Sequence, residues 1–193
     1  MTERGFIDYW NKNYPETFPV NHELKWVYPD RWFRIHSLPE SKRYPDTADE
    51  YKIILDRQNE LIDDLIGQEA EVVISFGLYT NDITNNNYHS LTDFGKFEKV
   101  LTIDLQKEKP EEYENGIGLD IYVMTEYWKS GKRDVILKAI ADDQIRAMFI
   151  SPSRKCIIAP YDGGVDVIVD STEQRDRLKQ KYKDWLSDRE DGM

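Results

Sequence analysis

The clearest pattern in the chain is a stripe of apolar residues at helical spacing, which predicts a helix from about Thr47 to Ile66. Thr47 and Glu50 stand at its start and fit a capping box, in which each side chain bonds a backbone N–H of the first turn. Gly67 then supplies a left-handed stop. The stripe consists of Tyr51, Ile54, Leu55, Gln58, Leu61, Ile62, Leu65 and Ile66.

Other segments alternate apolar with polar residues, or run through β-branched residues, as strands do. In residues 31–36 this alternation puts Phe33 and Ile35 on one face and Arg34 and His36 on the other. We expect strands at "RWFRIH", "AEVVISFGL", "VLTIDL", "GLDIYVM" and "VDVIV", and a hairpin in which a turn containing a proline joins "AMFIS" to "CIIAP".

Three more helices are expected: a short one at Phe6–Lys12, one at residues 133–145, and one from Ser171 to about Ser187. The strands cluster in the middle and end of the chain, and only some are separated by helices. That order is typical of the α+β class. We therefore predict a mostly antiparallel sheet packed by two or three amphipathic helices.

The chain shows no internal repeat and no linker of the length that separates domains, so residues 1–193 are interpreted as a single domain. Residues 1–30 form an aromatic segment punctuated by prolines, and residues 188–193 form an acidic tail. The aromatic side chains expected to cover one end of the core are Phe18, Trp26, Tyr28 and Trp32.

Composition adds that the chain is folded and strongly acidic. Hydrophobic residues make up 39% and aromatic residues 12%, which is more aromatic than disordered chains are. The 26 basic against 37 acidic residues give a formal charge of −11, which disfavours nucleic acid and anionic lipid and favours a basic protein partner. The sequence shows no secretory signal and no apolar run that would span a membrane, which indicates a cytoplasmic protein.

Catalytic and metal motifs are missing from the sequence. It contains no nucleophile elbow, no phosphate loop and no Rossmann glycine set, and its histidines (His22, His36 and His89) share no metal-ligand spacing. The single cysteine, Cys156, lies in the apolar run "KCIIAP" and is expected to be a buried core residue. We therefore assign no catalytic residue and expect no metal and no cofactor, and the sequence favours a non-enzymatic protein without deciding the question.

One stretch nevertheless gathers cations and hydroxyls before the long helix. A strand followed by a turn and a helix start would suit a phosphate or carboxylate there, which gives the alternative hypothesis of a small-molecule or nucleotide-binding domain, with or without enzymatic activity. The alternative is purely local: serines fold the turn, Arg34 pairs with an acid on a neighbouring strand, and the other cations face water. The candidate anion site consists of Arg34, His36, Ser41, Lys42 and Arg43, with Asp162 and Asp166 facing them across the sheet.

The acidic surface gives the leading hypothesis, a non-enzymatic protein that masks a basic surface on a partner, and a third interpretation is a scaffold whose charge serves solubility alone. The expected contacts lie on the polar face of the long helix, in the asparagine-rich loop after residue 80, and in the acidic tail. They are Asp56, Glu60, Asp63, Asp64, Asn81, Asp82, Asn86 and Tyr88.

Three segments resemble a bacterial family of about this length to which no activity is attached. They are "RIHSLPESKRYP", "EYKIILDRQNELIDDLIG" and "IAPYDGGVDVIV", the last followed by "LKQKYKDWLSDREDGM". The resemblance extends over nearly the whole chain and implies a bacterial cytosolic origin. It supplies no catalytic residues. By analogy only, it suggests a role like that of the small acidic immunity proteins that neutralise secreted bacterial toxins.

Overall fold

The computed structural model describes residues 2–80, 91–114, 116–187, 189 and 192. Within them, seven strands form one sheet in the order β1-β7-β6-β5-β2-β4-β3, and every neighbouring pair is antiparallel. The predicted α+β class is confirmed. The strands are β1 Trp32–His36, β2 Glu71–Tyr79, β3 Glu98–Asp104, β4 Gly118–Tyr127, β5 Ala147–Ser151, β6 Cys156–Tyr161 and β7 Gly164–Ile168.

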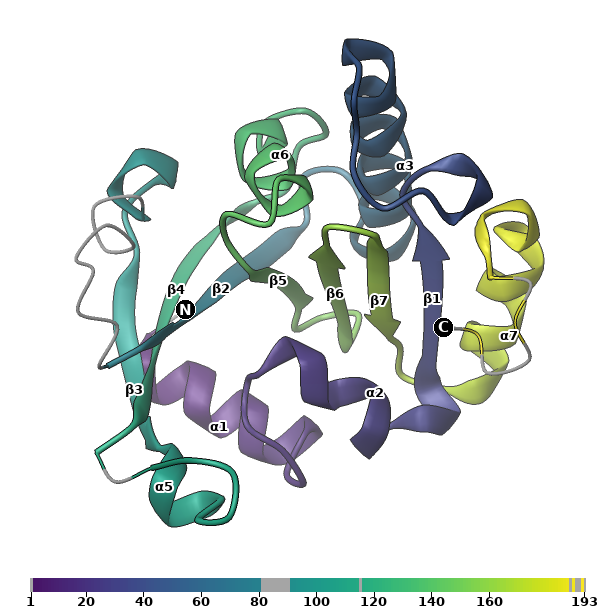
Figure 1. The fold of residues 1–193 in the computed structure, drawn as a ribbon. Helices are drawn as coiled ribbons and strands as arrows, with labels where there is room; N and C mark the ends of the chain where they lie inside the picture. Colours follow the sequence, from purple (N-terminus) through teal and green to yellow (C-terminus); the bar gives the residue numbers. More distant parts are fainter. Residues whose placement is uncertain (1, 81–90, 115, 188, 190–191, 193) are drawn as a thin grey trace.

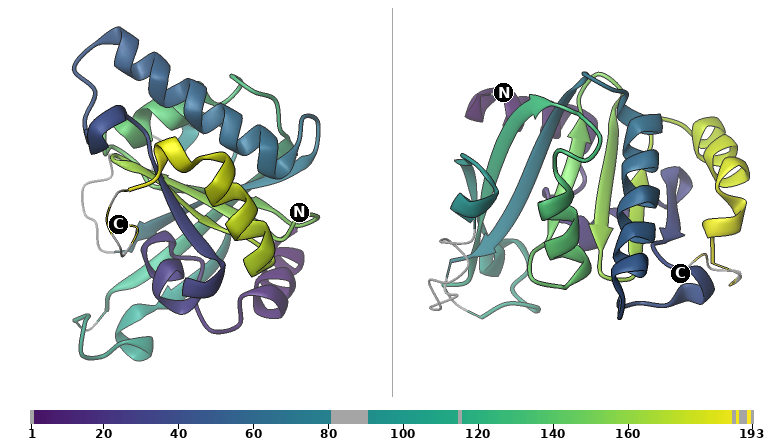
Figure 2. Two further views of the ribbon diagram at one scale, coloured as in Figure 1. Left: turned by 90° about the vertical axis from the view of Figure 1, so that its right-hand side faces the viewer. Right: turned by 90° about the horizontal axis from the view of Figure 1, so that it is seen from above.

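Helices α3 (Ala48–Ile66) and α6 (Asp134–Ala141) cover one face of the sheet (Figure 1). The apolar stripe of α3 packs there with residues of α6 and the inward side chains of the strands, such as Phe33 and Phe149. The expected capping box of Thr47 and Glu50 is present at the start of α3. Both views of Figure 2 place the yellow helix α7 (Thr172–Lys181) beside the strand β1.

The aromatic N-terminal segment covers the opposite face. Helix α1 (Glu3–Asn13) buries Phe6 and Trp10 against it, and the four-residue helix α2 (Leu24–Val27) buries Leu24. Because α2 is short and irregular chain surrounds it, this face is less evenly covered than the other. The remaining helical turns are α5 Leu105–Glu108, η1 Asn21–Glu23, η2 Pro29–Arg31, η3 Pro39–Ser41 and η4 Lys183–Trp185.

Two expectations about helices and aromatic residues were wrong. The last helix ends at Lys181 and not near Ser187, because the Tyr182 hydroxyl donates to Asp64 and its ring stacks on Trp185. These tertiary contacts hold the chain in the turn η4. Trp26 is 65% exposed and does not cover the core.

Gly164 is the residue that allows β1 and β7 to meet closely. It lies opposite His36 in the ladder, and a methyl group on its Cα would stand 2.2 Å from the Ile35 carbonyl oxygen. No side chain can be accommodated there unless the two strands separate.

The change Gly164→Ala should therefore lower the free energy of unfolding by about 3 kcal/mol, measured by urea denaturation. The matched control is Gly67→Ala, where a methyl group has nothing within 4 Å and the cost is that of a positive φ of 93°. That cost is about 1 kcal/mol. Equal losses in the two variants would contradict the close approach of β1 to β7.

Candidate functional site

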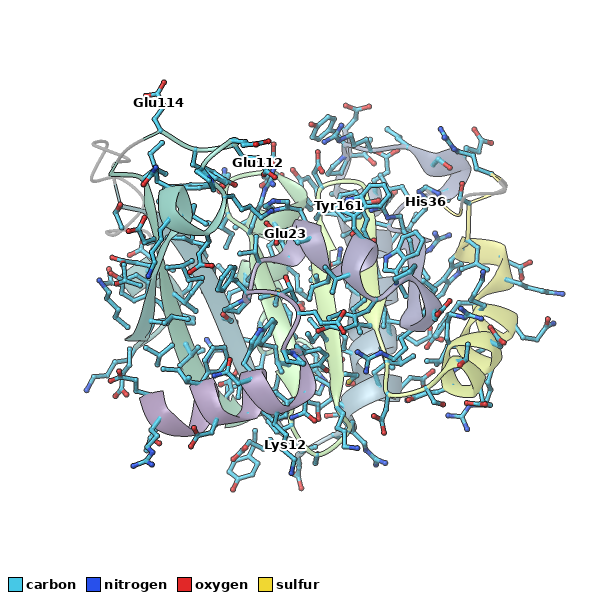
Figure 3. The ribbon with its side chains drawn as sticks, turned by 90° about the horizontal axis from the view of Figure 1, so that it is seen from below. Lys12, Glu23, His36, Glu112, Glu114 and Tyr161 are labelled. Carbon is cyan, nitrogen blue, oxygen red and sulfur yellow. The ribbon has the colours of Figure 1, made fainter. Side chains whose placement is uncertain are left out.

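The candidate site is a cleft of about 420 Å³ on the α2 face of the sheet, at the end where β1 finishes and β7 begins. In Figure 3 the labelled His36 and Tyr161 lie at this end of the strands, and Lys12 lies at the opposite end. Six of the seven residues expected in the anion site line this cleft. They are Arg34, His36, Ser41, Arg43, Asp162 and Asp166.

Arg34 and Asp166 form the base of the cleft. They face each other across β1 and β7, and the guanidinium donates twice, from Nε to Oδ1 at 2.8 Å and from Nη2 to Oδ2 at 2.9 Å. Trp32 Nε1 also donates to Oδ1, at 2.9 Å. Each member of the pair is only 11% exposed, so the pair is nearly desolvated. The expected local pairing of Arg34 with an acid on a neighbouring strand is confirmed.

The second pair, Arg43 and Asp162, lies at the rim. The Asp162 carboxylate is buried and accepts a hydrogen bond from Arg43 Nε. Burial alone would raise the pKa of Asp162, but hydrogen bonds from Arg43 and Tyr44, together with the charge of Arg43, outweigh it and hold the pKa below its usual range. Asp162 is therefore ionised at neutral pH.

Three further basic side chains, which were not expected in the anion site, reach the cleft. Lys25 comes from α2, His22 from η1, and Arg146 directly precedes β5. Burial, against the opposing effect of Glu23, lowers the pKa of His22, so its imidazole is neutral near pH 7. No spacing in the sequence marks these residues, because only the strand order brings them to one end of the sheet.

Four cations and two carboxylates line the cleft, which gives a formal excess of two positive charges when histidines are counted as neutral. This excess lies in a chain whose formal charge is −11. The four cations are Lys25, Arg34, Arg43 and Arg146, and the carboxylates are Asp162 and Asp166.

Lys42, the seventh expected residue, is not part of the cleft lining. Its ammonium group pairs with Asp46 at 2.8 Å and with Glu50 at 2.5 Å, at the start of α3. The same Glu50 carboxylate accepts from the backbone N–H groups of Asp46 and Thr47. The N-terminus of α3 is therefore occupied by its own capping residues. Side chains, rather than a helix terminus, supply the positive charge of the cleft.

The acidic residues predicted to contact a partner occupy a different surface. Asp56, Glu60, Asp63 and Asp64 border an open depression of about 660 Å³ beside Asp134. The other expected contacts, Asn81, Asp82, Asn86 and Tyr88, and most of the acidic tail lie outside the described residues.

Several of the acids in this depression are engaged within the chain. Asp63 accepts from Trp128 Nε1 at 2.6 Å. Asp64 pairs with Lys181 and accepts from Tyr182. Asp63 and Asp64 were predicted to contact a partner from the polar face of the long helix. Instead, Asp63 holds α3 to the residue after β4, and Asp64 holds α3 to α7. Their partners come from segments distant in sequence, so the helical pattern does not reveal them.

Cys156 lies in the core, as expected from its apolar neighbours. It is fully buried in β6, and burial raises the pKa of its thiol to about 12. Among residues whose placement is described, no group of three or more histidine, cysteine, aspartate or glutamate side chains is arranged to hold a metal ion. In the same part of the chain, no helix is long enough and apolar enough to cross a membrane.

Comparison with known proteins identifies the family. The chain belongs to the family described as "Domain of unknown function (DUF3885)", whose model matches residues 20–190. No curated protein and no solved structure matches the chain. The match covers the cleft, both strands of its base and the acidic depression, so the site belongs to the part of the chain that the family model describes.

Replacing Arg34 should test whether the buried pair anchors the cleft. Arg34→Met leaves the Asp166 carboxylate nearly desolvated without its countercharge, which should lower the free energy of unfolding by about 3 kcal/mol. Urea denaturation measures the change. The control is Lys52→Met, which removes an ion pair between side chains that are 73% and 63% exposed and should leave the urea midpoint unchanged. A loss in Arg34→Met no greater than in the control would show that the pair does not hold β1 to β7.

Proposed function

We propose that this member of the family binds a small anionic molecule in the cleft, with a phosphate or carboxylate group held by the arginines. The observation that supports the proposal most directly is the excess of positive charge in the cleft of an acidic chain. A volume of about 420 Å³ is also within the ordinary range for small-molecule sites.

The roles within the cleft follow from exposure. Arg34 is held rigidly by Asp166, and its guanidinium also lies 4.8 Å from the centre of the Tyr161 ring. Arg146 is 62% exposed, so it can turn toward a ligand, whereas Arg43 is 61% exposed but is bound to Asp162. Among the described residues, the one ion pair that Arg146 forms is a long contact of 3.9 Å with Asp143. We assign it the main contact with the anion.

The excess of two positive charges already takes the two carboxylates into account. Asp166 is bound bidentately by Arg34 and by Trp32, and Asp162 is bound by Arg43, so both acids face protein donors. An incoming anion would meet the cationic groups at the mouth and in the walls first. The rest of the negatively charged surface repels anions at long range, so the cleft is the place where an anion can approach favourably.

Inorganic phosphate should bind the chain, and Arg146→Ala should weaken this binding at least about fivefold, because a charge-assisted contact is lost. Isothermal titration calorimetry at low ionic strength measures the affinity. Added salt should weaken it, since the contacts are partly exposed. The matched control is Arg154→Ala, an exposed arginine in the turn at the opposite end of β5, which should leave the affinity unchanged.

Two results would contradict the proposal. One is the absence of heat with inorganic phosphate and with phosphate esters alike. The other is phosphate binding that Arg146→Ala and Arg154→Ala weaken equally, since that would place the anion on the general surface.

A second candidate function is docking of a basic protein partner on the acidic depression, in the manner of immunity proteins that neutralise toxins. The observation in its favour is that four acids predicted as partner contacts border a single depression together with Asp134. Glu60 is its most useful probe, because it is exposed there and lies one helical turn from Asp56 and Asp64.

If the depression binds a basic partner, the immobilised chain should retain a basic protein from a lysate of its native cells at low salt and release it at about 0.5 M salt. Glu60→Lys should abolish the retention, while Glu3→Lys, an equal charge change on the exposed start of α1, should preserve it. Retention that is insensitive to salt or to Glu60→Lys would exclude this surface.

A further inference from the structure

The cationic cleft adjoins a second cavity on the same face of the sheet. This chamber has a volume of about 260 Å³ and shares three lining residues with the cleft, namely Asn21, His22 and Arg146. Arg146 therefore stands at the boundary between the two. One ligand can reach both spaces through this boundary.

The lining of the chamber is mostly apolar, in contrast to the cleft. Pro19 and Val20 contribute from the N-terminal segment, Leu119 from β4 and Met148 from β5. An engineered apolar cavity of about 150 Å³ holds a benzene ring. A chamber of about 260 Å³ therefore has room for a single or a fused ring.

A buried hydroxyl group faces this apolar lining. Ser75, in the middle of β2, lies between Met148 on one neighbouring strand and Val123 on the other. It is only 1% exposed, and its Oγ has no hydrogen-bond partner among the residues that the structure describes. Buried polar groups are nearly always hydrogen-bonded, so this hydroxyl is a donor and an acceptor available to whatever fills the chamber.

Gly77 keeps the chamber open. It lies two residues beyond Ser75 on the same face of β2, and a methyl group at this position would stand 3.3 Å from Leu119 Cδ1. Any larger side chain would project into the space that Leu119 and Met148 border. The smallest residue and an unpartnered hydroxyl thus occur together on the strand that forms one wall.

We infer that the molecule bound by this protein carries an aromatic or heteroaromatic ring with a polar group, seated in the chamber against Ser75, and an anionic group seated in the cleft. This inference rests on the proposed function, because the cleft must hold the anion for the ring to be placed. The chemical class is a ring joined to a phosphate or carboxylate, as in an aryl phosphate or a nucleoside monophosphate.

The experiment compares three probes by isothermal titration calorimetry: inorganic phosphate, phenyl phosphate and adenosine 5′-monophosphate. Burial of a ring should make at least one of the two ring-bearing phosphates bind about tenfold or more tightly than inorganic phosphate. Gly77→Val should fill the chamber and reduce the affinity for that ligand to the level of inorganic phosphate. The affinity for inorganic phosphate itself should stay within about twofold of the unchanged chain, because the cleft is intact.

Ser75→Ala is the second variant and introduces no bulk, so it tests the chamber even if Gly77→Val fails to fold. It should weaken adenosine monophosphate about fivefold, the effect of one neutral hydrogen bond, and leave inorganic phosphate unchanged. If a water molecule alone satisfied the hydroxyl, Ser75→Ala would change neither affinity, and the assignment of Ser75 would be overturned.

The remaining outcomes separate the two proposals. If inorganic phosphate binds and neither ring-bearing phosphate binds more tightly, the chamber takes no ring and this inference fails, while the proposed anion cleft stands. If none of the three probes binds, the proposed function fails, and the inference fails with it.

Discussion

The sheet is covered on both faces, so a charge that is buried between a strand and this cover needs a partner within the protein. The pair of Arg34 and Asp166 meets this constraint, with Trp32 supplying a third hydrogen bond to the same carboxylate. The pair also ties β1, near the start of the chain, to β7, near its end. Removing water from two opposite charges is costly unless their hydrogen bonds are complete. Here the carboxylate oxygens are bound by planar donors on one sheet face, so the charge can stay buried at the base of the cleft.

The pairing of charges within the protein also explains how an acidic chain maintains a cationic cleft. Of the acids that border the depression beside α3, Asp64 is paired with Lys181, and neutral donors bind Asp63 and Asp64. Lys42 is drawn to the start of α3 by Asp46 and Glu50 and so leaves the cleft. Lys25 and Arg146, in contrast, line the cleft, and they arrive from α2 and from the residue before β5. The cationic character is a consequence of topology, and the net charge of the chain does not reveal it.

Local periodicity in the sequence predicts helices, strands and which side chains share a face, but it predicts only some of the residues that line the cleft. Alternation in residues 31–36 places Arg34 and His36 on the face opposite Phe33 and Ile35, and this arrangement is observed. The capping box of α3 and the buried position of Cys156 are likewise properties of short segments. Six of seven residues expected in an anion site do meet in one cleft, because a strand, a turn and the opposing strand position them.

Arg146 and His22 could not be predicted, since their place depends on the pairing of β5 with β2 and on how irregular chain crosses the sheet. The end of α7 was misjudged for a similar reason, because a tertiary contact of Tyr182 overrides the helical pattern.

The chamber beside the cleft depends on two features together, the cover of this sheet face and the small side chains of β2 beneath it. Helix α1, the four-residue helix α2 and irregular chain cover this face, and gaps in such a cover would ordinarily be filled by large side chains from the strands. At Ser75 and Gly77 the strand presents small side chains to one of these gaps. A buried hydroxyl without a partner is unfavourable for folding, so a sequence selected for stability alone would have an apolar residue at position 75. A glycine, a hydroxyl without a partner among the described residues and a neighbouring cationic cleft occur together here, and this combination supports the proposed ligand site. Efficient packing of the core provides no reason for it.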